Sequence, residues 1–201
     1  MLFTIGYSPF FEIEPFVQIL KKNKIQFLID VRTFPYSKTF PIYDYENLNK
    51  RLKEENIEHT FLGNYIGGLT VKNKVREGIS ELKDLLNVEK FKDGMNQLYK
   101  ISKKYKTAIM CAEKDPMDCH RFLAVGYLMN KVANVEVINL IEDREESLPQ
   151  TINRWKKENK LELLEYTDEQ IVKERLNLLY KIQNKKEERE IKVPKTKVLF
   201  E

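Results

Sequence analysis

Short apolar runs alternate along this chain with longer segments in which apolar residues recur at helical spacing. That alternation is typical of β-α units built around a mostly parallel sheet. We therefore expect an α/β fold, a three-layer sandwich in which helices flank a mostly parallel sheet of about five strands. The predicted strands lie at about residues 2–5, 25–31, 57–62, 107–112 and 135–141. Helices are predicted between them at about residues 44–56, 76–86, 91–105 and 116–131.

The last quarter of the chain has a different character, because helical patterns follow one another there without a buried-looking strand between them. Residues 147–150 and 167–170 both fit the capping-box pattern of a helix start. We expect a core domain over residues 1–145 and a helical extension over residues 146–201. The extension is predicted to pack on the core and to end in a basic tail.

Composition limits the classes of protein to which the chain can belong. Hydrophobic residues make up 42% of its 201 residues, which is enough for a core, and seven glycines and seven prolines exclude a collagenous or low-complexity chain. No window approaches the ~18 consecutive apolar residues of a membrane span, and the first residues are too short and uncharged a segment for a signal peptide. We expect a cytoplasmic protein without a membrane partner, and its oligomeric state stays open.

The excess positive charge of the chain lies near its C-terminus. The net charge is +4, and residues 181–197 hold seven lysines and arginines against three glutamates, which is also an excess of four. A basic tail can contact the phosphates of a nucleic acid. Because acidic residues are interleaved, however, the segment is more typical of a solvated helix end. Nucleic acid is therefore a second candidate partner.

Two groups of polar residues follow the first two predicted strands. Ser8 follows residues 2–5 and could offer a hydroxyl to an anion, or it could cap a helix or form a Ser-Pro turn. Asp30 and Arg32 end the second strand and lie on the same side of it, with Ser37 in the proline-rich loop behind them. This pair could hold a ligand, or it could tie the loop down as a structural ion pair.

A third group follows the fourth predicted strand and contains both cysteines of the chain. Cys111 leaves the strand, and Cys119 is predicted to lie in the first turn of the next helix. A thiol near a helix N-terminus and a cation can have a lowered pKa and act as a nucleophile. Arg121 would supply a planar fork for a phosphate or a carboxylate. Glu113 could carry a proton if burial raises its pKa.

Other interpretations of this group stay open. Cys119 and His120 are neighbours that cannot easily point at one tetrahedral ion, and no CxxC pair is present, so we expect no metal and no cofactor. The two thiols could instead fill space in the core. A strand-end Cys111 followed by Arg121 also resembles cysteine phosphatases and rhodaneses. Their loops bind anions, however, and acidic residues at 113, 115 and 118 would repel one here.

The same motifs resemble the domain-of-unknown-function family 488. Members of that family open with a Thr-Ile-Gly-His-Ser-like segment, continue with Asp-Val-Arg before a proline and a serine, and then show a Leu-Gly-Gly-like turn and Cys-x-Glu…Cys-His-Arg. The corresponding residues of this chain are Thr4 to Ser8, Asp30 to Arg32 with Pro35 and Ser37, Ile66 to Gly68, and Cys111 to Glu113 with Cys119 to Arg121. The resemblance implies an α/β sandwich with a shared site and implies no reaction. Tyr7 stands where the family usually has histidine.

In an open α/β sheet, ligands bind beyond the carboxyl ends of the strands. We expect one site there, with an anion held between Arg32 and Arg121. The predicted catalytic residues are Glu113, Asp30 and Cys111, and the predicted ligand-binding residues are Ser8, Arg32, Ser37, Gly67, Gly68, Cys119, His120 and Arg121. The predicted function is that of an enzyme or ligand-binding domain for a small anionic, phosphate- or nucleotide-like molecule. The alternatives are a nucleic-acid-binding module that uses the basic tail, and rhodanese- or phosphatase-like chemistry at Cys111.

Overall fold

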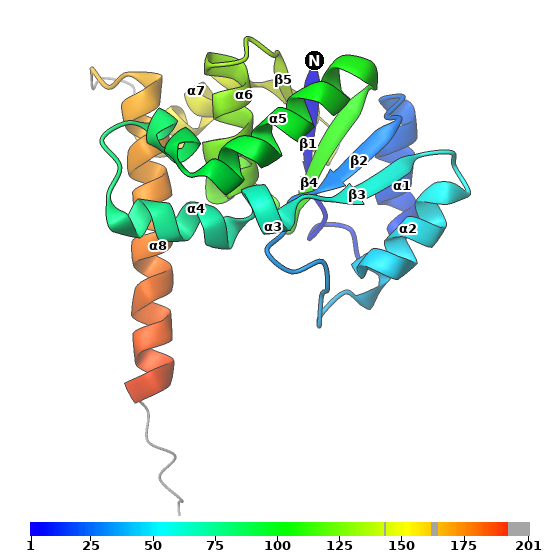
Figure 1. Cartoon of the computed structure of the whole chain (residues 1–201), viewed down its shortest axis with the longest axis horizontal. Coiled ribbons are helices and arrows are strands. Elements are labelled where there is room, and N and C mark those ends of the chain that lie inside the picture. The colour runs from blue at the N-terminus through cyan, green and yellow to red at the C-terminus, as the bar shows by residue number, and fades with distance from the viewer. Residues whose placement is uncertain (143, 162–164, 193–201) are drawn as a thin grey trace, which may run out of the picture.

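The sheet is mostly parallel and has its first and fourth strands at the centre (Figure 1). The computed structural model describes residues 1–142, 144–161 and 165–192 of the chain. The strands are β1 (Leu2–Gly6), β2 (Phe27–Asp30), β3 (Glu58–Phe61), β4 (Thr107–Cys111), β5 (Val137–Ile141) and β6 (Arg144–Ser147). Their order is β3-β2-β4-β1-β5-β6, and β6 alone among the strands of the described segments runs antiparallel to its neighbour. The predicted α/β fold is confirmed.

Helices cover both faces of this sheet. One face is covered by α1 (Ile13–Lys22), the short turn η1 (Pro41–Tyr43) and α2 (Tyr45–Lys53). The other face is covered by α3 (Gly63–Ile66), α4 (Gly68–Glu77), η2 (Leu82–Asn87), α5 (Glu89–Lys104), η3 (Pro116–Asp118), η4 (Arg121–Gly126), α6 (Tyr127–Lys131), α7 (Leu148–Glu158) and α8 (Asp168–Lys192). The result is the expected sandwich of three layers (Figure 1).

The prediction missed one strand and misplaced one helix. β6 has the sequence Arg-Glu-Glu-Ser, and its polar residues give no apolar signal because the strand lies at the edge of the sheet. The helix expected at residues 76–86 is wrong. α4 ends at Glu77, where Gly78 takes a positive φ of 101° that stops a helix, and η2 forms a separate short turn afterwards.

The helix expected at residues 116–131 is divided into pieces. Asp115 caps η3 as predicted, because its carboxylate accepts a hydrogen bond from the backbone N–H of Met117 at 2.8 Å. Cys119, however, is extended (φ −138°, ψ 137°) and does not lie in a first helical turn. The chain then continues as η4, a π-helical turn, before α6 begins. Such turns inside a helix are frequent at functional sites.

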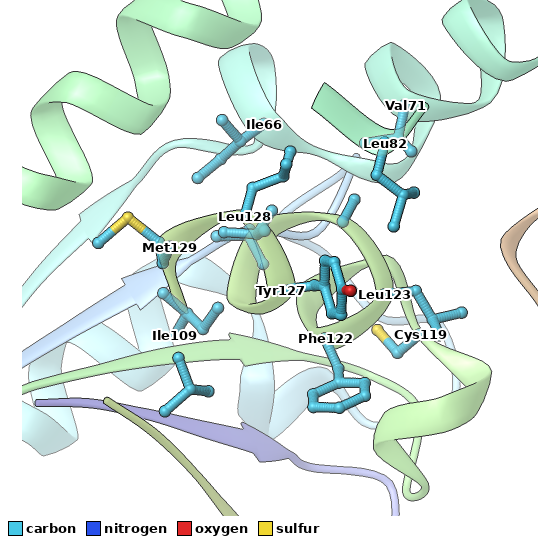
Figure 2. Close-up of a cluster of buried hydrophobic side chains, with 14 of the residues drawn as sticks. Ile66, Val71, Leu82, Ile109, Cys119, Phe122, Leu123, Tyr127, Leu128 and Met129 are labelled. Atoms are coloured by element: carbon cyan, nitrogen blue, oxygen red, sulfur yellow. The ribbon is translucent and has the colours of Figure 1, made fainter. Parts of the chain in front are cut away.

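The segment formed by η4 and α6 is the centre of the larger apolar cluster. All six residues of η4 are buried. Figure 2 shows Phe122, Leu123 and Tyr127 packed between strand residues such as Ile109 and the helices above them, with Cys119 at the margin of the cluster. Fully burying such side chains contributes about 1.5–3 kcal/mol each. The loop that precedes η4 is therefore held by well-packed structure on its C-terminal side.

The extension packs on this same cluster. Both predicted capping boxes are present, since side chains and backbone N–H groups bond reciprocally at residues 147 and 150 and at residues 167 and 170. Ile152 of α7 and Val172 and Leu176 of α8 are buried in the cluster. Most side chains of the predicted basic tail lie outside the described residues, as does all of residues 193–201. The boundary expected at residue 145 stays a prediction.

Among the helices of the described segments, none combines the length and the apolar character that crossing a lipid bilayer requires.

Gly94 tests the packing of α5 on α3. A Cβ at this position would lie 2.5 Å from Cβ of Tyr65 and 2.7 Å from Cγ2 of Ile66. Alanine improves helix propensity by about 1 kcal/mol, but overpacking a core costs about 1–3 kcal/mol. We expect Gly94→Ala to lower the free energy of unfolding in urea, whereas Asn96→Ala on the exposed side of α5 raises it slightly. Stabilisation by Gly94→Ala would contradict the close contact.

Candidate functional site

A cavity of about 490 Å³ opens at the carboxyl edge of the sheet. The strand register brings Gly6 of β1 opposite Cys111 of β4, and Asp30 of β2 opposite Met110 of β4, so these three strands end together. The loops after β1, β2 and β4, the start of α4 and the middle of α8 all contribute walls to the cavity. This is the edge at which the sequence predicts a site.

Six of the predicted site residues line the cavity. They are Arg32, Gly68, Cys111, Glu113, Cys119 and His120. Three separate stretches of chain supply them: the end of β2, the start of α4 and the segment from β4 to η4. The structure therefore brings together the second and third polar groups of the sequence.

Three other predicted residues do not line the cavity and instead contribute to the structure of the loops around it. The N–H of Ser8 donates to the carbonyl of Ala112 at 3.0 Å, which joins the loops after β1 and β4. Ser37 stabilises its own loop, since its N–H donates to Asp44 at 2.7 Å and its hydroxyl accepts from Phe40. Gly67 is the residue before the first turn of α4.

Asp30 lies behind Arg32 and is fully buried. Nε and Nη2 of Arg32 donate to its carboxylate at 2.6–3.0 Å, and Nη2 also donates to the carbonyl of Tyr43 at 2.8 Å. Burial raises the pKa of Asp30, and the hydrogen bonds and charge of Arg32 oppose that shift. Asp30 thus holds Arg32 in place and has no access to the cavity.

The free side of Arg32 carries the most informative feature of the site. Its guanidinium lies over the ring of Tyr7, with Cζ 5.2 Å from the ring centroid. Within the part of the chain that the structure describes, Nη1 of Arg32 is buried and has no hydrogen-bond partner. Buried polar groups in native proteins are almost always paired, so this donor marks a position where a partner is expected.

Arg121 has a different role from the one expected. Its side chain is fully buried, and Nη1 and Nη2 donate to the carbonyls of Glu113 (2.5 Å) and Lys114 (3.1 Å). Nε donates to Oγ1 of Thr4 at 3.4 Å. A Cβ at Gly6 would lie 1.8 Å from the same Glu113 carbonyl, so glycine allows the loop to approach β1. Arg121 holds the loop after β4 and does not line the cavity.

The two sulfurs and the imidazole form a compact group. Nδ1 of His120 lies 3.9 Å from Sγ of Cys119 and 4.0 Å from Sγ of Cys111. Nε2 of His120 lies 2.9 Å from the carbonyl oxygen of Val31, which fixes the ring. Sγ of Cys119 is also joined to Oε2 of Glu113 by a hydrogen bond of 2.9 Å.

The two sulfurs differ in their electrostatic environment. Burial opposes ionisation of Cys119, but the hydrogen bond from Cys111 and the charges of Arg121 and His120 hold its pKa well below the ordinary value. The hydrogen bond to Cys119 and burial raise the pKa of Cys111 well above that value. Although part of Glu113 reaches solvent, its carboxyl group is enclosed, and this desolvation raises its pKa to about 7. Cys119 is thus the more acidic thiol of the two.

Several cavity residues were missed by the sequence analysis. Tyr7 and Thr33 are next to predicted residues along the chain, and the hydroxyl of Thr33 accepts from the N–H of Leu69 at 3.0 Å. Lys72 of α4 and Tyr180 of α8 come from distant segments. No local pattern could have identified these two, because only the packing of α4 and α8 brings them to the site.

The extension also fixes the loop between β4 and η4. Arg154 of α7 forms an ion pair with Asp115 at 2.9 Å, and Arg175 of α8 forms one with Asp118. The hydroxyl of Tyr180 donates to the carbonyl of Gly68 at 3.0 Å. The helices after residue 146 therefore complete the site.

Comparison with known proteins identifies the family. A model of the family described as "Domain of unknown function DUF488" matches residues 12–128, more than half of the chain. No curated protein and no solved structure matches. The matched segment includes Arg32 and the whole stretch from Cys111 to Arg121, and it ends before α7 and α8. The resemblance seen in the sequence is confirmed: the chain belongs to the DUF488 family of domains of unknown function.

Proposed function

We propose that the cavity binds a small anionic molecule of phosphate- or nucleotide-like chemistry, and that the chain acts on this molecule there. The observation that carries the proposal is Nη1 of Arg32, a buried cationic donor without a partner in the described structure. Leaving a buried donor unsatisfied costs about 1–3 kcal/mol. An oxygen of a phosphate or a carboxylate would remove that cost, and the planar guanidinium suits such oxygens.

The start of α4 supports the same ligand class. Gly68 and Leu69 open a helix of ten residues and line the cavity, so the positive end of the helix dipole faces it. Gly68 also leaves room, because a Cβ there would lie 3.3 Å from Nδ1 of His120. Lys72, one turn further along α4, is buried and lines the same cavity. The start of α4 adds positive potential beside Arg32.

The acidic residues after Cys111 are less repulsive to an anion than the sequence suggests. Asp115 is paired with Arg154, and Asp118 is paired with Arg175. In each pair the arginine offsets negative charge of its carboxylate partner. The sequence-based objection to an anion in this place rested on Glu113, Asp115 and Asp118, and the pairing of two of these three weakens it.

Two exposed aromatic residues favour a ligand that also carries a ring. Phe34 and Tyr36 are 71% and 58% exposed, and both line the cavity beside Arg32. Exposed aromatic side chains are a common stacking surface for nucleotide bases. A phosphate on Arg32 and a base against Phe34 would together fit a nucleotide-sized molecule.

Two of the predicted catalytic residues remain in this proposal. Glu113 and Cys111 line the cavity, where Glu113 is placed to exchange a proton with a bound molecule. Asp30 is excluded from that role, because it is fully buried against Arg32. We infer that Asp30 positions the guanidinium instead.

Arg32→Lys tests the anion site directly. Lysine keeps a charge next to Asp30 but removes the fork and Nη1, and a hydrogen bond to a charged group contributes about 1.5–3 kcal/mol. We expect calorimetry to show binding of inorganic phosphate weakened about tenfold or more. Arg51→Lys, at a surface arginine paired with Glu14, should bind phosphate as the natural chain does. Unchanged phosphate binding by folded Arg32→Lys would overturn the proposal, as would absence of phosphate and nucleotide binding by the natural chain.

Phe34→Ala tests the nucleotide-like part of the proposal. Stacking on an aromatic side chain contributes about 1–3 kcal/mol per base, so affinity for adenosine monophosphate should fall about 5- to 100-fold. Affinity for inorganic phosphate should not change. Phe11 is 78% exposed and does not line the cavity, so Phe11→Ala is the matched control. Equal loss of both ligands in Phe34→Ala would show a general disturbance of the cavity and contradict stacking.

A further inference from the structure

Three side chains that classically bind soft metal ions meet in this cavity. The sulfurs of Cys111 and Cys119 and a ring nitrogen of His120 all lie within 4.8 Å of one another, and all three residues are buried. In a tetrahedral zinc site the S···N distance is roughly 3.6 Å, from bonds of about 2.3 Å to sulfur and about 2.0 Å to nitrogen. The observed distances of 3.9 and 4.0 Å need to change by only a few tenths of an ångström.

The backbone explains how neighbouring residues can face one centre. Along a regular strand Cys119 and His120 would point to opposite sides. Here Cys119 is extended, whereas His120 already has helical angles (φ −59°, ψ −25°) at the start of η4. The turn between them directs both side chains inwards. The objection that adjacent cysteine and histidine cannot share an ion therefore does not apply to this local geometry.

The histidine is oriented as a ligand. A carbonyl oxygen can only accept, so Nε2 of His120 carries the proton that it donates to Val31. A metal that displaced the remaining ring proton would meet the lone pair of Nδ1, which faces the two sulfurs. A backbone carbonyl on the far nitrogen is the usual support of a metal-bound histidine.

The surroundings of the sulfurs are also those of metal thiolates. The backbone N–H of Arg121 donates to Sγ of Cys119 at 3.5 Å, which supports negative charge on sulfur. Two buried thiols without a metal must either keep their protons or hold a buried charge, and a metal deprotonates both and balances their charge. All three residues line the cavity, so one coordination position would remain open to it.

We propose that Cys111, Cys119 and His120 bind one zinc ion, with the fourth coordination position facing the cavity. Thiolate and imidazole ligands favour Zn²⁺ over Mg²⁺ or Ca²⁺, and two cysteines with one histidine are a ligand set of catalytic rather than structural zinc. The metal site rests on its own geometry. Its use as a Lewis acid toward a phosphate or carboxylate oxygen rests on the proposed function.

The test is reconstitution of the reduced full-length chain with Co²⁺, whose thiolate complexes absorb in the near ultraviolet, followed by displacement with Zn²⁺. We expect one equivalent per chain, with a sulfur-to-cobalt charge-transfer band and the intense visible bands of tetrahedral cobalt. Cys111→Ser and Cys119→Ser should each abolish the charge-transfer spectrum or reduce it about twofold with weaker binding. His59→Gln is the matched control, because His59 lies on β3, is not part of the group, and is the other histidine of the chain.

Thiol reactivity makes the proposal testable even if the serine variants do not fold. The chain has two cysteines, both in the proposed site. In the natural chain, bound zinc should protect both thiols from a thiol reagent. Removal of the zinc by a chelator should restore the reactivity of both thiols. No charge-transfer band, or reaction of both thiols at the same rate with and without zinc, would overturn the metal site.

Arg32→Lys separates this proposal from the anion site. We expect that variant to bind phosphate about tenfold or more weakly while it binds one equivalent of Co²⁺ with the natural spectrum. If the natural chain binds phosphate but shows no cobalt charge-transfer spectrum, the metal site is overturned and the anion site stands. The reverse result would overturn the anion site alone.

Discussion

The site depends on the hydrogen bonds that the buried guanidinium of Arg121 donates. This group binds two successive carbonyl groups, those of Glu113 and Lys114, and so holds the loop after β4 against β1. That loop carries Glu113 on one side and leads to Cys119 and His120 on the other. Gly6 is part of the same arrangement, because any side chain there would displace the Glu113 carbonyl. This anchor therefore fixes the stretch that joins Cys111, at the end of β4, to Cys119 and His120.

The helices after the family-matched segment strengthen the same loop from outside. Arg154 and Arg175 reach it from α7 and α8 and pair with Asp115 and Asp118. Such pairs contribute little to stability when exposed, but here they hold the two ends of η3, and Arg175 also offsets the negative charge of Asp118, which lines the cavity. Tyr180 closes the wall beside α4. The extension thus shapes both the geometry and the potential of a site whose motif residues lie in the core.

The sequence was sufficient to predict features that depend on local patterns. It did not predict features that are determined by contacts between distant segments. Apolar runs located β1, β2, β4 and β5, and the apolar residues on either side of residues 58–60 located the edge strand β3. The ends of the strands located most of the site. The two arginines look alike in sequence, yet among the described residues Nη1 of Arg32 has no partner, whereas Arg121 donates to two carbonyls. Only the fold decides which carbonyls each arginine meets. The shared direction of Cys119 and His120 depends on one change of backbone angles that no residue type specifies. Tyr180 lines the cavity from α8, which is far along the chain from the other residues of the site.

The free donor of Arg32 has an energetic meaning for the whole fold. Asp30 and the Tyr43 carbonyl satisfy one side of the guanidinium, and the ring of Tyr7 covers it, so the group is held rigidly although Nη1 has no described partner. Rigid positioning before a ligand arrives lowers the entropy lost on binding. Burying a donor without a partner costs about 1–3 kcal/mol, and under the proposed function a bound oxyanion would remove that cost. In the proposed function, the buried pair of Asp30 and Arg32 is the part of the anion site that is held in position before binding.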